Sequence, residues 1–413
     1  MNRRFFLLAS AAMVAAPAWA VPEAGTITGG YGGRIIRVTT LAPQGPGSIT
    51  EAVKAKGPRI VVFEVGGVID LAMETLEIKS DDITIAGQTA PSLVTFIRGG
   101  IAIRGENVII RNIAVRPGEA GQAKKSGWEC DGIYAYGAAR VEVSNCSITW
   151  ATDEGLSASG KRFEGANADE WRANTSHTIM FRNNIVAEGL SNSTHSKGEH
   201  SKGTLIHDNV RDATIVDSLY AHNRERNVLF KGGAQGLMAG NVVYNPGKRF
   251  AHYNLHANEW EGHPFEAGKV RVERNAFLAG PSTDAKAAAV MVGGDGPLTL
   301  EIENNLTLRA DGSALPMTGR FGDGTPVLDL RMNTQFDDAA AVRANMARAL
   351  ETCGAWAWAR DPIDARIVED VRKGTGRIID SENEVGGYPV RPETRAAFVE
   401  SEWHLASMVR RSS

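Results

Sequence analysis

The sequence predicts an all-β protein, a single-stranded parallel β-solenoid that ends in a short helical and extended tail. Three observations support this fold. Short runs of β-branched and other apolar residues fill most of the chain. A phrase of alternating apolar residues that ends near an asparagine recurs, and most successive copies start roughly 25 to 37 residues apart, as in stacked repeats. The Asn-Gly turns of antiparallel hairpins are scarce, which disfavours the alternative, a β-sandwich.

The β-runs can be placed along the chain. Early ones occupy residues 59–63, 83–85, 93–97 and 101–103. The recurring phrase then occupies residues 107–112, 140–145, 177–184, 213–217, 236–241, 269–275 and 298–305. We expect each phrase to form one strand of a coil, with alternate side chains inside. Asparagine at the strand end suits a turn residue that tolerates left-handed backbone and hydrogen-bonds its stacked neighbours.

The end of the chain has a different pattern. Residues 337–351 are rich in alanine and arginine, with Val342, Met346 and Leu350 spaced four apart, which predicts an amphipathic helix. Residues 364–373 indicate a second short helix. Pro389 and Pro392 favour extended chain after it. We expect this tail to pack on the solenoid and cover apolar surface.

The first twenty residues resemble a secretory signal. Arg3 and Arg4 precede a short apolar stretch, residues 5–16, and Ala18-Trp19-Ala20 is typical of a cleavage site. The stretch is too short to span a bilayer. We therefore expect a signal peptide at 1–20, with twin-arginine export as one route, and a secreted or periplasmic protein. The β-helix would occupy residues 21–335 and the tail residues 336–413.

Composition narrows the class of protein further. The 413 residues are 43% hydrophobic and 23% charged, which excludes a disordered chain and a membrane protein. The net charge of −3 gives no general positive field for nucleic acid. The three cysteines, Cys130, Cys146 and Cys353, cannot form a full disulfide framework, and we expect buried thiols, with one bridge as the alternative. We expect a monomer without nucleic-acid or membrane partners.

Two acidic pairs lie roughly one coil apart. Glu129 and Asp131 precede one predicted strand, and Asp153 and Glu154 follow the next. Residues two apart in an extended strand share a face, and stacked coils bring equivalent faces together. Carboxylates gathered from two coils form a hard-oxygen site that suits Ca²⁺. The alternative is ordinary solvated acids in turns.

A basic stretch follows on the next two repeats. Residues 195–202 contain Lys197, His200 and Lys202, and residues 222–231 contain Arg226 and Lys231. Such cations beside a Ca²⁺ site would form a groove for a polymer that carries carboxylates, because arginine binds a carboxylate with two hydrogen bonds and lysine acts as a point charge. The alternative is a solvated charged loop. Three later histidines and a tryptophan are expected to pack in turns, with a place along the groove as the alternative: His252, His256, His263 and Trp260.

Several segments, in order, resemble the pectate lyase family. The resemblance extends from about Gly29 to Pro389 and rests on residues 83–91, 141–154, 221–227, 241–245 and 384–389. It implies a right-handed parallel β-helix that cleaves a polyuronate, such as polygalacturonate, by β-elimination with Ca²⁺.

The resemblance also implies roles for single residues. Arg226 would be the base that removes the proton α to the carboxylate, and Lys202 would bind substrate beside it. Lys231, His200 and Lys197 would bind substrate. The calcium ligands would be Glu129, Asp131 and Asp153, with Glu154 able to replace the fourth expected acid, whose position holds Ser157. The chain also departs from the family pattern at Val228, in place of proline, and at Lys231, in place of arginine.

Two other functions fit a solenoid of this kind. A glycoside hydrolase related to polygalacturonases would need paired carboxylates at a set separation. The aspartate pair beside Gly-His-Gly that such enzymes carry is not visible in the sequence. A non-catalytic polyuronate-binding relative is the third reading, since the basic motif is altered.

Overall fold

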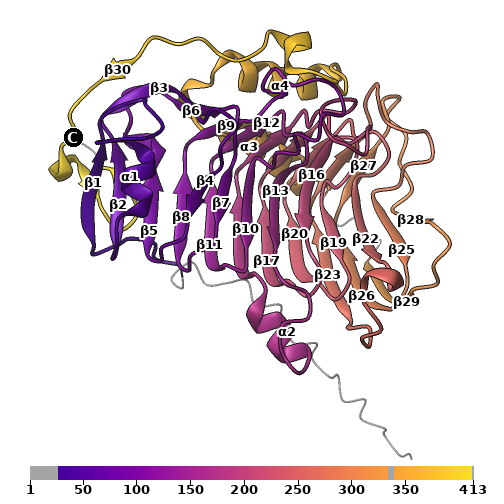
Figure 1. The fold of residues 1–413 in the computed structure, drawn as a ribbon. Helices are drawn as coiled ribbons and strands as arrows, with labels where there is room; N and C mark the ends of the chain where they lie inside the picture. Colours follow the sequence, from indigo (N-terminus) through magenta and orange to yellow (C-terminus); the bar gives the residue numbers. More distant parts are fainter. Residues whose placement is uncertain (1–26, 334–338, 412–413) are drawn as a thin grey trace, which may run out of the picture.

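The computed structural model describes residues 27–333 and 339–411, and these form a right-handed parallel β-helix (Figure 1). Each coil contributes strands to three long sheets that run side by side along the axis of the helix. The predicted all-β solenoid is confirmed, and a full coil holds three strands rather than one phrase alone. The predicted signal peptide at 1–20, and the predicted boundary at 335 and 336, lie outside the described residues.

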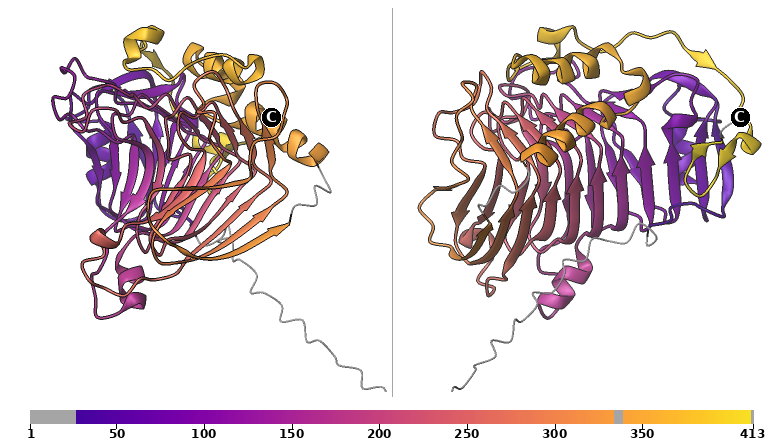
Figure 2. Two further views of the ribbon diagram at one scale, coloured as in Figure 1. Left: turned by 90° about the vertical axis from the view of Figure 1, so that its right-hand side faces the viewer. Right: turned by 180° about the vertical axis from the view of Figure 1, so that it is seen from behind.

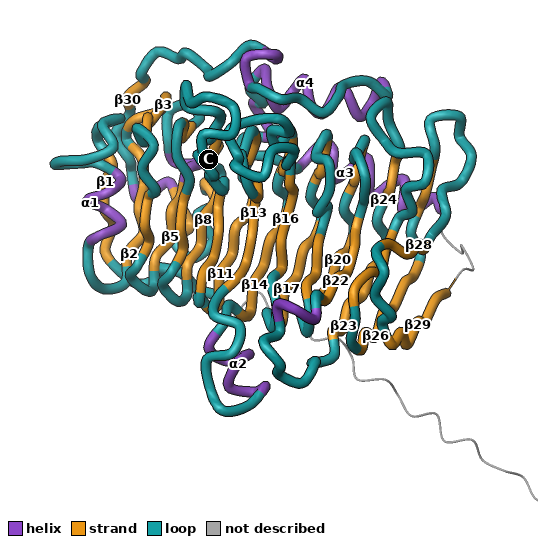
Figure 3. The backbone as a smooth tube through the Cα atoms, turned by 45° about the vertical axis from the view of Figure 1, so that its right-hand side comes forward, coloured by secondary structure: helices purple, strands orange, loops and turns teal. Residues whose placement is uncertain are grey.

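The strands of each sheet follow one another in chain order, with parallel pairing between neighbours. The eleven-stranded sheet contains β1 (Arg34–Val38), β2 (Arg59–Phe63), β5 (Ile83–Ala86), β8 (Val108–Arg111), β11 (Ala139–Ser144), β14 (His177–Arg182), β17 (Arg211–Val216), β20 (Gln235–Ala239), β23 (Gly268–Glu273), β26 (Pro297–Glu303) and β29 (Val327–Asn333). The nine-stranded sheet contains β4 (Leu76–Ile78), β7 (Ile101–Ile103), β10 (Ile133–Tyr136), β13 (Glu154–Ser159), β16 (Lys202–Ile206), β19 (Leu229–Lys231), β22 (Ala251–Leu255), β25 (Val290–Gly294) and β28 (Thr318–Phe321). Figure 3 shows the strands as successive rows joined by loops.

The third sheet has ten strands, of which the last pairs antiparallel. It contains β3 (Val65–Asp70), β6 (Val94–Ile97), β9 (Ala114–Arg116), β12 (Ser147–Thr149), β15 (Ile185–Ala187), β18 (Leu219–Ala221), β21 (Val242–Tyr244), β24 (Ala276–Leu278), β27 (Leu306–Leu308) and β30 (Thr394–Arg395). A small hairpin near the C-terminus joins β31 (Trp403–His404) and β32 (Val409–Arg410).

Helices lie outside the coils. The α-helices are α1 (Ile49–Lys54), α2 (Ala168–Asn174), α3 (Ala339–Thr352) and α4 (Pro362–Lys373), and the 3₁₀ turns are η1 (Gly87–Thr89), η2 (Ala257–Glu259), η3 (Ala357–Ala359), η4 (Glu382–Val385) and η5 (Glu400–Glu402). None of the helices in the described residues is long and apolar enough to cross a membrane. The loop that carries α2, residues 160–176, projects from the side of the solenoid (Figure 1).

The interior is built by the alternation that the sequence predicts. One buried column passes through successive strands of the eleven-stranded sheet, each residue registered on the next. Its members are Val61, Ile85, Ile110, Val143, Phe181, Ile215 and Met238. Each such side chain contributes about 1.5–3 kcal/mol by leaving water. The three cysteines are buried free thiols, as expected.

The turn between the eleven- and ten-stranded sheets carries an asparagine ladder. The side-chain Oδ1 of Asn275 accepts from the backbone N–H of Asn241, and Oδ1 of Asn305 accepts from that of Asn275, both at 2.9 Å. The residue just before each ladder position has positive φ, for example Arg274 (53°) and Asn304 (51°). The sequence predicted that a single asparagine would both adopt the left-handed backbone and hydrogen-bond the neighbouring coils. In the structure, the residue before the asparagine has the left-handed backbone, and the asparagine forms the hydrogen bonds.

The tail packs on the ten-stranded sheet, where α3 and α4 lie along one face of the solenoid (Figure 2). The two predicted helices are confirmed within the described residues, at Ala339–Thr352 and Pro362–Lys373. Asp361 caps α4 by accepting from the N–H of Asp364, Pro362 begins the helix, and Gly374 ends it in the left-handed conformation. Arg116 of β9 forms fully buried ion pairs with Asp361, at 2.7 Å, and Asp364, at 3.1 Å.

Candidate active site

Four successive coils bring charged residues into one row, which follows the N-terminal ends of strands in the nine-stranded sheet. The backbone carbonyl of Glu154 accepts from the N–H of Gly132, so Asp131 and Glu154 lie on neighbouring coils. Glu154 of β13 is registered on Lys202 of β16, and Lys202 is bridged in turn to Glu225. Neighbouring strands lie about 4.8 Å apart, so these side chains interact directly.

Three carboxylates form the acidic half of this row. One oxygen from each of Asp131, Asp153 and Glu154 lies within 4.8 Å of the others. Burial raises the pKa of Asp131 well above its usual range, and the charge of Asp153 raises it further. Ser157, where the family pattern expects a fourth acid, has its hydroxyl 3.4 Å from Asp131 and can donate to it. A bound cation would stabilise these crowded carboxylates, of which Asp131 has the raised pKa, and their hard oxygens fit Ca²⁺.

Arg226 lies directly against these acids. Its Nη1 forms an ion pair with Oε1 of Glu154, and its side chain is 25% exposed. Burial lowers the pKa of Arg226, while Asp153 and Asp131 partly restore it. A lowered pKa is the direction that a base requires, although an arginine is normally protonated throughout the pH range of proteins. Val228, in the position of the expected proline, is fully buried in the core.

Lys202 shares one carboxylate with a second cation, in a network that the sequence did not reveal. Its Nζ forms an ion pair with Oε1 of Glu225, and Nη1 of Arg249 pairs with Oε2 of the same carboxylate. Burial opposes the ionisation of Glu225, but Lys202 and the other nearby cations outweigh it and hold its pKa at about 2. His252, expected in a turn, lies fully buried on β22 beside this network, and burial lowers its pKa to about 3.

The remaining predicted cations lie in different surroundings. Nζ of Lys231 pairs with Glu259 and lies 3.5 Å from Asp208, so two acids already contact it. Lys197 is exposed, and its backbone N–H, not its ammonium, contacts the cluster by donating to Nδ1 of His195. Arg226, Lys202 and Lys231 therefore lie at the row or beside it, whereas Lys197 contacts the cluster through its backbone alone among the described residues, and its role in substrate binding stays a prediction.

Glu129 also differs from the other predicted calcium ligands. Among the described residues, it is not a member of the three-carboxylate group. Its Oε1 accepts from the backbone N–H of Ser196 at 3.0 Å and lies 3.3 Å from Nδ1 of His195. The assignment of Glu129 as a direct calcium ligand stays a prediction.

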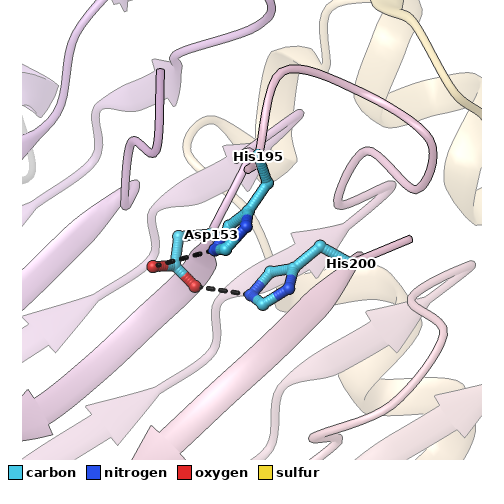
Figure 4. A group of neighbouring side chains, drawn as sticks. All are labelled: Asp153, His195 and His200. Carbon is cyan, nitrogen blue, oxygen red and sulfur yellow. Dashed lines mark hydrogen bonds and ion pairs between the residues drawn. The ribbon is translucent and has the colours of Figure 1, made fainter. Parts of the chain in front are cut away.

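Two histidines, His195 and His200, point at the carboxylate of Asp153 (Figure 4). Nε2 of His200 lies 2.7 Å from Oδ1 of Asp153, and Nε2 of His195 lies 3.8 Å from Oδ2. Burial opposes the ionisation of Asp153, but the contact with His200 outweighs it, so the pKa of Asp153 is lowered. His200, predicted to bind substrate, thus has Asp153 as its partner.

A groove continues from Arg226 along the later coils. It encloses a cavity of about 470 Å³ whose lining includes Glu225, Lys231, Asn254 and Glu259. The guanidinium of Arg249 lies 4.0 Å above the ring of Phe321 at its far wall. A charged, open groove along several coils can hold an extended polymer rather than a small molecule.

Comparison with known proteins finds similar sequences and a similar fold. No family model matches the chain. A protein of Emericella nidulans called "Probable pectate lyase C" is 30% identical over 375 residues, which cover 87% of this chain and 76% of that protein. Its counterpart in Neosartorya fischeri, with the same name, is 29% identical over 371 residues, covering 87% and 78%. The crystal structure of Jun a 1, the major allergen from cedar pollen, superposes with a TM-score of 0.51 at 14% identity, covering 78% of this chain and 89% of that one.

Proposed function

The chain belongs to the pectate lyase family, and from this membership we propose that it cleaves polygalacturonate-type polyuronates by calcium-assisted β-elimination. The products are unsaturated oligouronides. The observation that carries the proposal is the contact of Arg226 with the acids Asp131, Asp153 and Glu154, one coil from the buried ammonium of Lys202.

Asp131, Asp153 and Glu154 would hold the calcium ion, because their oxygens converge and their repulsion is relieved by a cation. When bound, Ca²⁺ supplies positive charge that neutralises a substrate carboxylate and makes the neighbouring carbon acid stronger. Glu129 lies at the edge of this group, next to His195.

Arg226 acts as the base. A guanidine nitrogen takes the proton from C5 of the uronate, the electron pair left on C5 forms the C4–C5 double bond, and the C4–O bond to the leaving sugar breaks. The leaving oxygen takes a proton from solvent. Because Nη1 of Arg226 pairs with Glu154, this ion pair must open before that nitrogen can take the proton. Rising pH increases the neutral fraction of Arg226, so an alkaline optimum is expected.

Lys202 binds the substrate carboxylate, where negative charge accumulates as the C5 proton leaves. Glu225 and Arg249 position Lys202, since the ammonium and the guanidinium share one carboxylate. Lys231 lies further along the same groove and meets the carboxylate of another sugar unit. His200 acts by holding Asp153. The enzyme acts as a monomer outside the cytoplasm, after removal of residues 1–20.

One assay tests this proposal. The purified protein is incubated with polygalacturonate in the presence and absence of Ca²⁺, and the ultraviolet absorbance of the unsaturated uronate is followed beside the appearance of reducing ends. A lyase raises both signals together, and only with the cation. New reducing ends without absorbance would identify a hydrolase instead, and binding without either signal would identify a non-catalytic relative.

A further inference from the structure

We propose that Asp153, His195 and His200 form a second metal site, which takes a borderline transition-metal ion such as Co²⁺ or Zn²⁺. This site is distinct from the three-oxygen group, and it rests on the proposed function only through Asp153, which both groups share. One donor atom from each of the three residues lies within 4.8 Å of the others (Figure 4). The proposed elimination chemistry uses His200 to hold Asp153, and it gives His195 no role.

The three side chains come from two segments that fold against each other. Asp153 stands immediately before β13, and both histidines belong to the loop between β15 and β16. The side chains of His195 and His200 are 1% and 7% exposed. Histidines in a surface loop are usually solvated. Two of them buried against one carboxylate therefore indicate a preorganised binding site rather than a chance cluster.

The donor types favour a borderline metal over calcium. Imidazole nitrogen suits Zn²⁺ and its first-row neighbours, whereas Ca²⁺ prefers oxygen ligands alone. The two rings stack with centroids 3.7 Å apart and planes 17° apart. This close packing holds the two imidazole rings side by side next to the carboxylate of Asp153. An ion would draw both Nε2 atoms to one point and turn the rings out of this stack.

Glu129 supplies the outer contact that such sites normally have. Its Oε1 lies 3.3 Å from Nδ1 of His195, on the opposite side of the ring from Asp153. The backbone N–H of Lys197 approaches the same Nδ1 at 3.1 Å. In the described structure Nδ1 accepts from Lys197; a metal at Nε2 would shift the ring proton to Nδ1, displace the Lys197 N–H, and let Nδ1 donate to Glu129, which would fix the orientation of the ring. The position of Glu129, apart from the three-oxygen group, is thereby explained.

The test uses full-length protein without a histidine tag, stripped of metals and then kept in excess Ca²⁺. Co²⁺ is titrated in, and its visible absorption is recorded with the fraction of ion bound. The expected result is one bound Co²⁺ per chain, with the absorption of an imidazole-ligated ion. His195→Gln and His200→Gln should each weaken binding by roughly tenfold or more, and Glu129→Gln by about tenfold. His404→Gln, in the exposed hairpin near the C-terminus, is the matched control and should bind as the parent does.

Two results would overturn the second site. One is a parent protein that leaves Co²⁺ with the spectrum of the hydrated ion, and the other is an unchanged titration in both histidine variants. If a histidine variant fails to fold, the parent spectrum and Glu129→Gln still decide. Lyase activity is measured separately with Ca²⁺ alone, so that activity without Co²⁺ binding refutes only the second site. Co²⁺ binding without lyase activity refutes only the proposed function.

Discussion

Two flanks of the solenoid stack side chains from coil to coil in different ways. On the ladder flank, Asn241, Asn275 and Asn305 repeat one neutral side chain, and the amides of Asn241 and Asn275 each donate to the asparagine of the next coil. On the groove flank, successive coils present unlike charges, and Glu154 and Glu225 flank Lys202. Where the groove stacks like charges, as with Asp131 and Asp153, ionisation is opposed and the pKa of Asp131 is raised. The ladder flank therefore serves stability, and the groove flank gives up stability for chemistry.

The largest effect should come from the base. Arg226→Lys keeps a cation beside Glu154 but moves the nitrogen, and we expect kcat to fall by roughly 10²–10⁴-fold, the usual contribution of a positioned base. Steady-state rates on polygalacturonate with saturating Ca²⁺ measure it. Arg224→Lys is the matched control, because Arg224 lies two residues away and pairs with Glu199. A rate close to that of the parent in Arg226→Lys would remove Arg226 from the mechanism.

A substitution in the asparagine ladder should lower stability and leave activity unchanged. Asn275→Ala leaves the buried N–H of Asn241 without its acceptor, and each such loss costs about 1–3 kcal/mol. We expect unfolding in urea to show a loss of about 2–3 kcal/mol while the activity of each folded molecule is unchanged. Asn258→Ala, at an exposed position in η2, is the control. Unchanged stability in Asn275→Ala would show that the ladder carries no free energy.

A buried acid on the ladder side tests whether repulsion between carboxylates is confined to the groove. Burial, with Asp361 nearby, raises the pKa of Asp364 to about 6, above the usual 3.8. Folding therefore favours the protonated form, and its contribution is complete below about pH 3.8 and lost as pH rises through about 6. Asp364→Asn should remove about 2 kcal/mol of this pH dependence. Unfolding free energies measured from pH 4 to 7 in both proteins check this, and parallel curves would contradict it.

The smallest change in stability tests the contrast between the two flanks most directly. Asp131→Asn removes one of the crowded charges, so in metal-free protein we expect a gain of about 1 kcal/mol. The same change should abolish activity and the stabilisation that Ca²⁺ gives to the parent protein. Thermal unfolding with and without Ca²⁺ measures both. A metal-free Asp131→Asn protein less stable than the parent would contradict the view that the groove acids repel.

The fold could be predicted because its signals are local and repeated. Alternation identified the strands, and the spacing of Val342, Met346 and Leu350 identified α3, in which Val342 and Leu350 are buried. The order of the coils also placed Arg226 and Lys202 on one flank. The exact partners could not be predicted, because the loops before β16 and β19 have no period that would fix which residue meets which. Thus Lys202 is bridged to Glu225, which the sequence did not single out, and Glu129 contacts Ser196.

The projecting loop at 160–176 shows that the coils stay aligned when a long segment is inserted between two strands. It inserts α2 between β13 and β14, yet β14 still meets β11 in register, with Glu142 opposite Met180. Alignment of the coils is thus set by the interior and the short turns, and it is insensitive to how much chain leaves and returns on the other side. A solenoid of this kind can acquire or lose whole loops over its binding surface in single evolutionary events, with no compensating change in its frame.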